Sequence, residues 1–271
     1  MTWKKKLCLM FSLLLLLSGC AGTTVPVPAE ETTVAPEPTT EQTMAWAETG
    51  ETQPTETTEP AEETEAPFQL HSGIREDGTF DEGTLFIGDS QTYGLVTVYL
   101  KEHDLLGDAK YMAMPGAAVT VFFNGPKMRR GNSAFSQEFE GLIFSEAAAQ
   151  AGADVTAVYF MLGTNHSKYA SEETYVSIVE YLMEVCPNAT VYLQTVPYAT
   201  SSKVNYREAN RRIQAAYEHF ALENNRRVFL IDTQAAIGYQ LNSGGVHLTS
   251  KGQESWYQGL LDFAKEQGIA Q

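Results

Sequence analysis

Short apolar runs alternate with helix-forming stretches along the chain after residue 80. Five runs have the length and composition of strands, at residues 85–87, 111–114, 155–162, 191–196 and 228–231. The intervening and following stretches predict helices over residues 91–103, 137–150, 171–185, 203–225 and 249–267. Residues 155–162 are nearly all apolar, as in a strand buried on both faces. This alternation predicts a three-layer α/β/α domain with a five-stranded parallel sheet.

The first 20 residues differ from this pattern. Lys4, Lys5 and Lys6 precede an eleven-residue apolar run, which is too short to span a bilayer as a mature helix. The sequence Leu17-Ser18-Gly19-Cys20 then resembles the lipobox of bacterial lipoproteins. The resemblance implies a signal peptide over residues 1–20 and acylation of Cys20, which would hold the protein at the outer face of the membrane. The alternative is an ordinary secretory signal with a chance cysteine.

Residues 21–67 predict a disordered, extracytoplasmic tether. They contain eleven Glu, no Lys and no Arg, with many Thr and Pro, so they bury too little surface to offset chain entropy. The net charge of −16 is therefore uneven: this segment contributes −11 and the signal region +3, which leaves −8 for a domain over residues 68–271. A mildly acidic domain gives no support for nucleic-acid binding.

Cysteines and histidines give no sign of a metal or cofactor. Cys186 is the only cysteine of residues 68–271, so no disulfide can form within the domain, and we expect this thiol to be a small buried hydrophobe. The five histidines are scattered, and the chain has neither an HExxH motif nor a glycine-rich phosphate loop. No metal or organic cofactor is indicated.

Polar residues follow the predicted strands, where ligands of parallel α/β sheets bind. The first strand ends in Gly88-Asp89-Ser90 and the second at Gly116. The third ends in Gly163-Thr164-Asn165, and Gly245-Val246-His247 precedes the last helix. This order and spacing resembles the SGNH hydrolases (GDSL family) over about residues 84–264. The family is named for a Ser, a Gly, an Asn and a His, which fall here on Ser90, Gly116, Asn165 and His247.

The resemblance implies a flavodoxin-like fold and a serine esterase. Ser90 is the nucleophile and His247 the base, because a neutral hydroxyl needs a base within hydrogen-bond reach. The oxyanion donors are the backbone N–H groups of Ser90 and Gly116 and the Asn165 amide, each worth roughly 3 kcal/mol by analogy with one measured donor. We expect Asp89 to shape the turn. The alternatives are purely structural roles: a simple turn at Ser90, and capping by Asn165 and His247.

The sequence departs from the family at two positions. Gly244 stands where the family has an Asp three residues before the His, and His166 replaces the Asp that often follows the Asn. Loss of the carboxylate in a protease triad costs on the order of 10⁴ in turnover. Three explanations stay open: a Ser–His dyad oriented by a backbone carbonyl, another acid such as Asp232, or a degraded enzyme that only binds. We favour the dyad.

The substrate side of the site is predicted from less specific signals. Residues 117–136 form a long connection, which favours either a cleft wall or an ordinary surface excursion with buried Phe. The candidate substrate-binding residues are Tyr93, Phe122, Phe123, His166 and Tyr198. An anchor and a tether favour an acyl ester on a polymer, so our hypothesis is deacetylation of O-acetylated carbohydrate, with acyl transfer as an alternative that uses the same residues. The rival hypotheses are a non-catalytic carbohydrate-binding or wall-associated lipoprotein and a two-lobed solute-binding lipoprotein.

Overall fold

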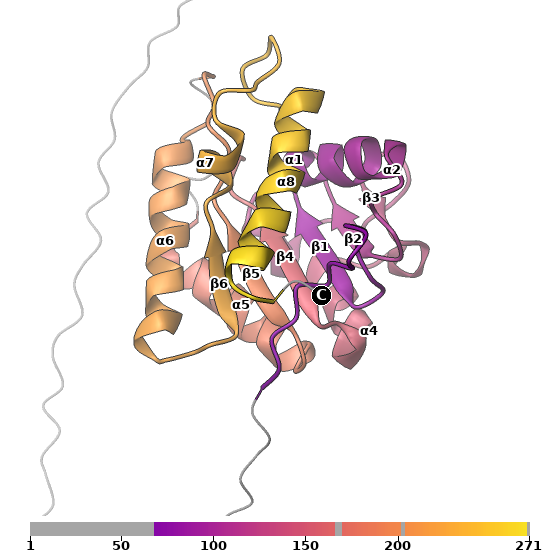
Figure 1. The fold of residues 1–271 in the computed structure, drawn as a ribbon, viewed down its shortest axis with the longest axis vertical. Coiled ribbons are helices and arrows are strands. Elements are labelled where there is room, and N and C mark those ends of the chain that lie inside the picture. Colours follow the sequence, from indigo (N-terminus) through magenta and orange to yellow (C-terminus); the bar gives the residue numbers. More distant parts are fainter. Residues whose placement is uncertain (1–67, 166–169, 202–203, 270–271) are drawn as a thin grey trace, which may run out of the picture. The chain divides into compact units, whose positions relative to one another are not determined.

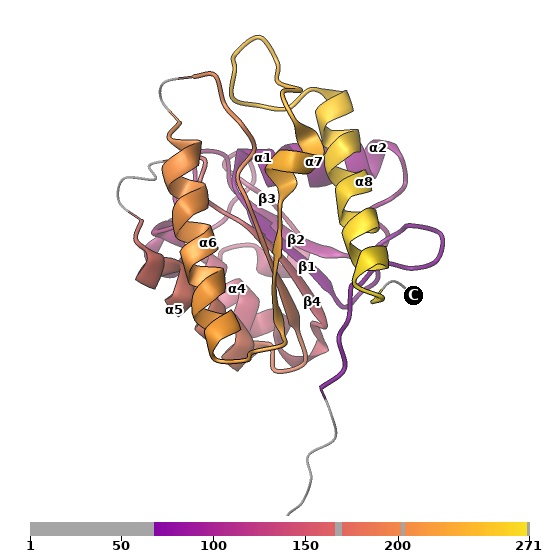
Figure 2. The same cartoon turned by 60° about the vertical axis from the view of Figure 1, so that its left-hand side comes forward.

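The computed structural model describes residues 68–165, 170–201 and 204–269. The predicted signal peptide, Cys20, the predicted tether and His166 lie outside these ranges. The described residues form a central sheet with helices on its two faces (Figures 1 and 2). Within this part of the chain, no helix has the length and apolar character needed to cross a membrane.

The sheet contains the five predicted strands and a sixth at its edge. The strands are β1 (Thr84–Gly88), β2 (Lys110–Ala113), β3 (Ala134–Phe135), β4 (Ala157–Met161), β5 (Thr190–Gln194) and β6 (Val228–Ile231). Their order is β3-β2-β1-β4-β5-β6, and only the β2–β3 pair is antiparallel. Without β3, the strand order is that of flavodoxin-like sheets, so the predicted fold class is confirmed. The predicted strand count is wrong by one, because β3 is a two-residue strand without a pattern of its own.

The helices cover the sheet from both sides. One layer contains α1 (Ser90–Gly94), a π-helical turn (Leu95–Tyr99), α2 (Leu100–Glu102), α7 (Thr233–Ile237) and α8 (Ser250–Glu266). The other layer contains α4 (Phe144–Ala151), α5 (Glu172–Val185) and α6 (Tyr206–Leu222), with the short α3 (Val121–Asn124) beside α4. The predicted helix over 137–150 is wrong at its start. A 3₁₀ turn (Gln137–Phe139) comes first, and Gly141 at φ +84° interrupts the helix before α4 begins.

A row of aromatic side chains crosses the sheet on the face that α8 covers. Phe86, Tyr159, Tyr192 and Phe229 are register partners on β1, β4, β5 and β6. Successive rings stack with centroids 5.2, 4.8 and 5.7 Å apart. Cross-strand aromatic pairs each stabilise a sheet by up to about 1 kcal/mol, so this row fixes the register that aligns the strand ends.

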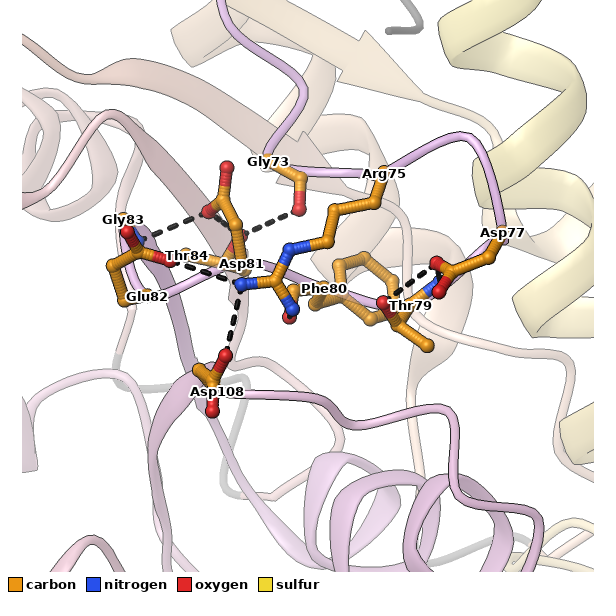
Figure 3. A network of polar contacts seen from close by, with 10 residues as sticks. All are labelled: Gly73, Arg75, Asp77, Thr79, Phe80, Asp81, Glu82, Gly83, Thr84 and Asp108. Atoms are coloured by element: carbon orange, nitrogen blue, oxygen red, sulfur yellow. Dashed lines mark hydrogen bonds and ion pairs between the residues drawn. The ribbon is translucent and has the colours of Figure 1, made fainter.

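The first described residues run past the amino ends of the strands. The His71 N–H donates to Thr190 Oγ1, and the Thr84 hydroxyl donates to the Gly73 carbonyl, each at 3.0 Å. Arg75 fastens the next turn: its Nη2 lies 3.0 Å from a Glu82 carboxylate oxygen and 2.8 Å from one of Asp108 (Figure 3). The chain therefore enters the domain at the amino ends of the strands, whereas the predicted site lies at their carboxyl ends.

Cys186 lies in the core at the end of α5, as predicted. The side chain is fully buried, and its thiol donates to the Ala148 carbonyl at 3.7 Å. Burial raises the pKa of this thiol to about 11. A thiol that is protonated at neutral pH and buried is a poor nucleophile, so Cys186 packs the core and does not compete with Ser90.

Candidate active site

Ser90 is the first residue of α1, directly beyond the carboxyl end of β1. Asp89 caps this helix, with one carboxylate oxygen accepting the Gln91 N–H at 2.9 Å. Gly88 lets the backbone of this turn lie close to Thr92 and to the end of β4. A Cβ there would lie 1.9 Å from Thr92 Oγ1 and 2.7 Å from the Met161 carbonyl oxygen. The Gly-Asp-Ser turn therefore places a half-buried hydroxyl at the edge of the sheet.

Asp89 also ties the β1 turn to the loop after β4. Its second carboxylate oxygen accepts the Thr164 N–H at 3.2 Å and lies 3.5 Å from Asn165 Nδ2. The carboxyl is fully buried, and this desolvation raises its pKa, whereas the hydrogen bonds from Gln91 and Thr164 act in the opposite direction. The contacts of Asp89 are thus those of a residue that shapes the turn.

His247 faces Ser90 from a turn between α7 and α8. Its Nε2 lies 3.0 Å from Ser90 Oγ, although 157 residues separate them in the chain. The Asn242 N–H donates to the His247 carbonyl at 2.8 Å, and Leu241 pairs with Leu248, so the turn has a fixed form. The exposed imidazole sits within the distance that a general base needs to take the hydroxyl proton.

Gln91 joins the two halves of this pair, and no sequence signal identified it. Its side chain is 3% exposed, and Nε2 donates to the Val246 carbonyl at 2.7 Å. This bond fastens the residue after the candidate nucleophile to the residue before the candidate base. A glutamine that follows Gly-Asp-Ser carries no pattern that would reveal a partner so far along the chain.

No acid orients His247 within the described ranges. Gly244 has no side chain to offer, and neither a carboxylate nor a backbone carbonyl of the described residues accepts a hydrogen bond from His247 Nδ1. Asp232 has another role: its Oδ1 accepts the Ala235 N–H at 3.0 Å and the Thr195 hydroxyl at 3.2 Å, which caps α7. The expected backbone carbonyl and the alternative acid Asp232 are therefore both wrong as orienting groups among the described residues, and the pair is Ser90 and His247 alone.

Gly116 and Asn165 lie together at the same edge of the sheet. Gly116 is exposed and adopts φ +79°, a left-handed conformation that favours glycine. A Cβ added there would have no atom of the described residues within 4 Å, apart from its chain neighbours. Asn165 pairs with Ala118 across the gap between the β2 and β4 loops. Its Nδ2 donates to the Ala117 carbonyl at 3.2 Å, and the contact with Asp89 is long, so one amide N–H has no short protein acceptor among the described residues.

The structure separates the predicted substrate-binding residues. Phe122 is fully buried, with its ring centroid 6.2 Å from that of Phe160, so the prediction that it lines a cleft is wrong. Phe123 is half-buried and packs edge-on against Phe122 and Tyr181. The connection over 117–136 contains α3 and β3, and its apolar side chains are buried, as Val119 and Met128 are, or half-buried, as Val121 and Phe135 are. Tyr93 on α1 is 36% exposed, and Tyr198 is half-buried beyond β5.

Comparison with known proteins yields structural similarity only. No protein-family model matches the sequence, and no curated protein matches it. The chain is similar to a protein from Slackia heliotrinireducens assigned as an SGNH hydrolase, at 19% identity and TM-score 0.44, covering 66% of this chain and 96% of that one. It is similar to the lipase/acylhydrolase from Enterococcus faecalis, at 18% identity and TM-score 0.44, covering 68% and 96%.

A third similar structure is the C-terminal catalytic domain of peptidoglycan O-acetyltransferase A from Streptococcus pneumoniae. The identity is 15% and the TM-score 0.45, covering 68% of this chain and 93% of that domain. All three TM-scores are below 0.5, so the functional proposal rests on the site geometry described above.

Proposed function

We propose that this chain is a serine esterase of the SGNH type that uses a Ser90–His247 dyad. One observation carries the proposal: a serine at a helix start and a histidine lie 3.0 Å apart at the carboxyl edge of the sheet, beside Gly116 and Asn165. A hydroxyl and an imidazole at this distance form the minimal nucleophile and base of acyl transfer.

The reaction follows from these positions. His247 Nε2 accepts the Ser90 proton as Oγ attacks the ester carbonyl, and the carbonyl oxygen becomes an oxyanion. The proposed donors to that oxygen are the backbone N–H groups of Ser90 and Gly116 and the side-chain amide of Asn165, whose N–H would exchange its long contact with Asp89 for the oxyanion. The protonated imidazole then gives its proton to the leaving alcohol. His247 then takes a proton from water as the water attacks the acyl-serine, and the imidazolium returns this proton to Ser90 Oγ as the acid leaves.

The proposed setting is the outer face of a membrane. Lys4–Lys6, the apolar run and Cys20 support export and lipidation, and residues 21–67 support a tether ahead of the domain. A polymeric ester fits this setting, and we propose acetyl groups on a carbohydrate as the substrate. Transfer of the acyl group to another alcohol would use the same residues, with that alcohol replacing water.

The second candidate function is a non-catalytic, carbohydrate-binding lipoprotein on the same fold. The absence of an acid at Gly244 favours it, because an unsupported imidazole loses orientation and stabilisation of its charged form. The two candidates differ in whether Ser90 and His247 matter for turnover, which a simple ester can test.

The test is hydrolysis of p-nitrophenyl acetate by residues 21–271. We expect turnover by the native sequence and its loss, by 100-fold or more on the scale of triad deletions, in Ser90→Ala and His247→Ala. Ser243→Ala, an exposed serine in the same turn as His247, is the matched control and keeps activity. Circular dichroism checks folding. A rate that is equal in all four proteins would refute esterase chemistry at this site toward an activated ester.

A further inference from the structure

Three tyrosines gather beyond the carboxyl ends of β5 and β6. The Tyr198 ring centroid lies 4.3 Å from that of Tyr239 and 4.9 Å from that of Tyr206, with both pairs edge to face. Tyr239 is 76% exposed, although its ring carries a large apolar surface. Tyr198, packed between its two neighbours, holds this exposed ring against a pocket instead of leaving it isolated.

The pocket beside this cluster combines the aromatic rings with polar groups. Its volume is about 370 Å³, and it is lined by Tyr198, Asp232, Gln234, Ala235, Gly238 and Tyr239. The side chains of Asp232 and Gln234 are each fixed by a hydrogen bond to a neighbouring residue, and each keeps polar atoms available for a ligand. Asp232 caps α7 through Oδ1, which leaves Oδ2 as an acceptor, and the Gln234 Oε1 accepts Asn210 Nδ2 at 2.8 Å, which leaves its amide N–H groups as donors.

Backbone hydrogen bonds connect the residues that follow Tyr198 and Tyr239 to the turn that carries His247. The Thr200 N–H, two residues beyond Tyr198, donates to the Gly245 carbonyl at 2.9 Å. Gln240 follows Tyr239, and its carbonyl accepts the Thr249 N–H at 3.0 Å. Two lining residues of the pocket, Tyr198 and Tyr239, therefore lie within two residues of backbone hydrogen bonds to the turn that carries His247, and α7, which supplies Gln234 and Ala235, packs against α8.

We propose that this pocket is a glycan subsite that binds a neutral pyranose ring of the substrate while the acyl ester lies at Ser90. The proposal rests on the proposed esterase function and names its substrate side. The C–H face of a sugar packs on an aromatic ring, and sugar hydroxyls pair with Asp232 and Gln234. Among the described residues, the lining contains a carboxylate and no cation, so this carboxylate would repel a uronate or phosphate group.

Binding is measured first, without catalysis. Calorimetric titration of the Ser90→Ala chain with cellopentaose, xylopentaose and the pentamer of N-acetylglucosamine is expected to give binding of at least one. Tyr239→Ala in this background weakens that binding about tenfold, whereas Leu222→Ala, which removes an apolar side chain that is 85% exposed on α6, leaves it unchanged. No binding of any of the three at 10 mM, or equal binding by both variants, overturns the subsite.

The charge of the pocket gives a second readout. A galacturonate pentamer is expected to bind at least about tenfold more weakly than the best neutral sugar. Asp232→Asn keeps a side chain that can cap α7 but removes the negative charge, so it should reduce this difference in affinity between the two sugars. Tighter binding of the uronate would overturn the neutral specificity.

Kinetics then separate the subsite from the chemistry. With Ser90 intact, Tyr239→Ala keeps its rate on p-nitrophenyl acetate and loses about tenfold in kcat/KM, through KM, on the O-acetylated form of the bound sugar. A variant that keeps this kcat/KM on the sugar ester refutes the subsite and leaves the esterase intact. A chain that binds the sugar through Tyr239 but hydrolyses neither ester refutes the esterase and leaves the subsite.

Discussion

Gly244→Asp tests whether the missing acid limits this site. The structure allows the change. Gly244 is exposed, and its φ lies outside the left-handed region. Among the described residues other than its chain neighbours, a Cβ added there would have one heavy atom within 4 Å, Asn242 Oδ1 at 3.3 Å. Asn242 is also exposed, so its side chain can move by the few tenths of an ångström required. The new carboxylate would stand three residues before His247, on the turn that carries the imidazole.

The expected gain lies between two limits. Loss of the triad acid in a protease costs about 10⁴ in turnover, which is the most that a perfectly placed acid could restore. An exposed ion pair contributes at most about 1 kcal/mol, or roughly fivefold. Because His247 and Gly244 are both exposed, the smaller limit applies, and we expect kcat on p-nitrophenyl acetate to rise about two- to fivefold.

The matched control is Gly244→Asn, which has the same shape without the charge. The assay compares kcat of the two variants with the native sequence at neutral pH, with melting temperature as the check on folding. If Gly244→Asp is folded and no faster than Gly244→Asn, orientation of the imidazole does not limit the rate. That result would refute the inference that His247 is a weak base because no carboxylate accepts a hydrogen bond from Nδ1.

Three further predictions test the scaffold. Gln91→Ala removes the bond to the Val246 carbonyl and should lower kcat about tenfold with little change in KM; an unchanged kcat would contradict its positioning role. Phe122→Ala should lower the free energy of unfolding by about 3–5 kcal/mol in denaturant titration, and an unchanged free energy would contradict the burial of this ring. Arg211 lowers the pKa of Glu208 to about 2, so Glu208→Gln should reduce stability at pH 7; this difference should persist below the ordinary value of 4.5 and vanish as the pH approaches 2.

Most of the sheet was predictable because its central strands β1, β4 and β5 are fully buried. The run at 155–162 and its four companions are mostly apolar; β4 and β6 lie inside their runs, and β1, β2 and β5 overlap theirs. β3 and α7 were missed for the opposite reason. β3 has two residues, Ala134 and Phe135, and its existence depends on the open edge of β2, which no local pattern encodes.

The candidate dyad was accessible from sequence because the segments around Ser90, Gly116, Asn165 and His247 resemble those of the SGNH hydrolases, and that resemblance pairs Ser90 with His247. Their surroundings were not accessible. Phe122 and Tyr239 are both aromatic residues in connecting segments, yet one is fully buried and the other is 76% exposed. Four-residue α3 is too short for an apolar period to show which face is inward.

The entry of the chain past the amino ends of the strands gives the domain a direction. His71 and Gly73 are bonded at one edge of the sheet, whereas Ser90 and His247 occupy the other. Whatever precedes residue 68 joins the domain at the far pole from the candidate catalytic pair. A substrate held at this candidate pair would therefore lie at the opposite end of the domain from the point where the preceding chain is attached.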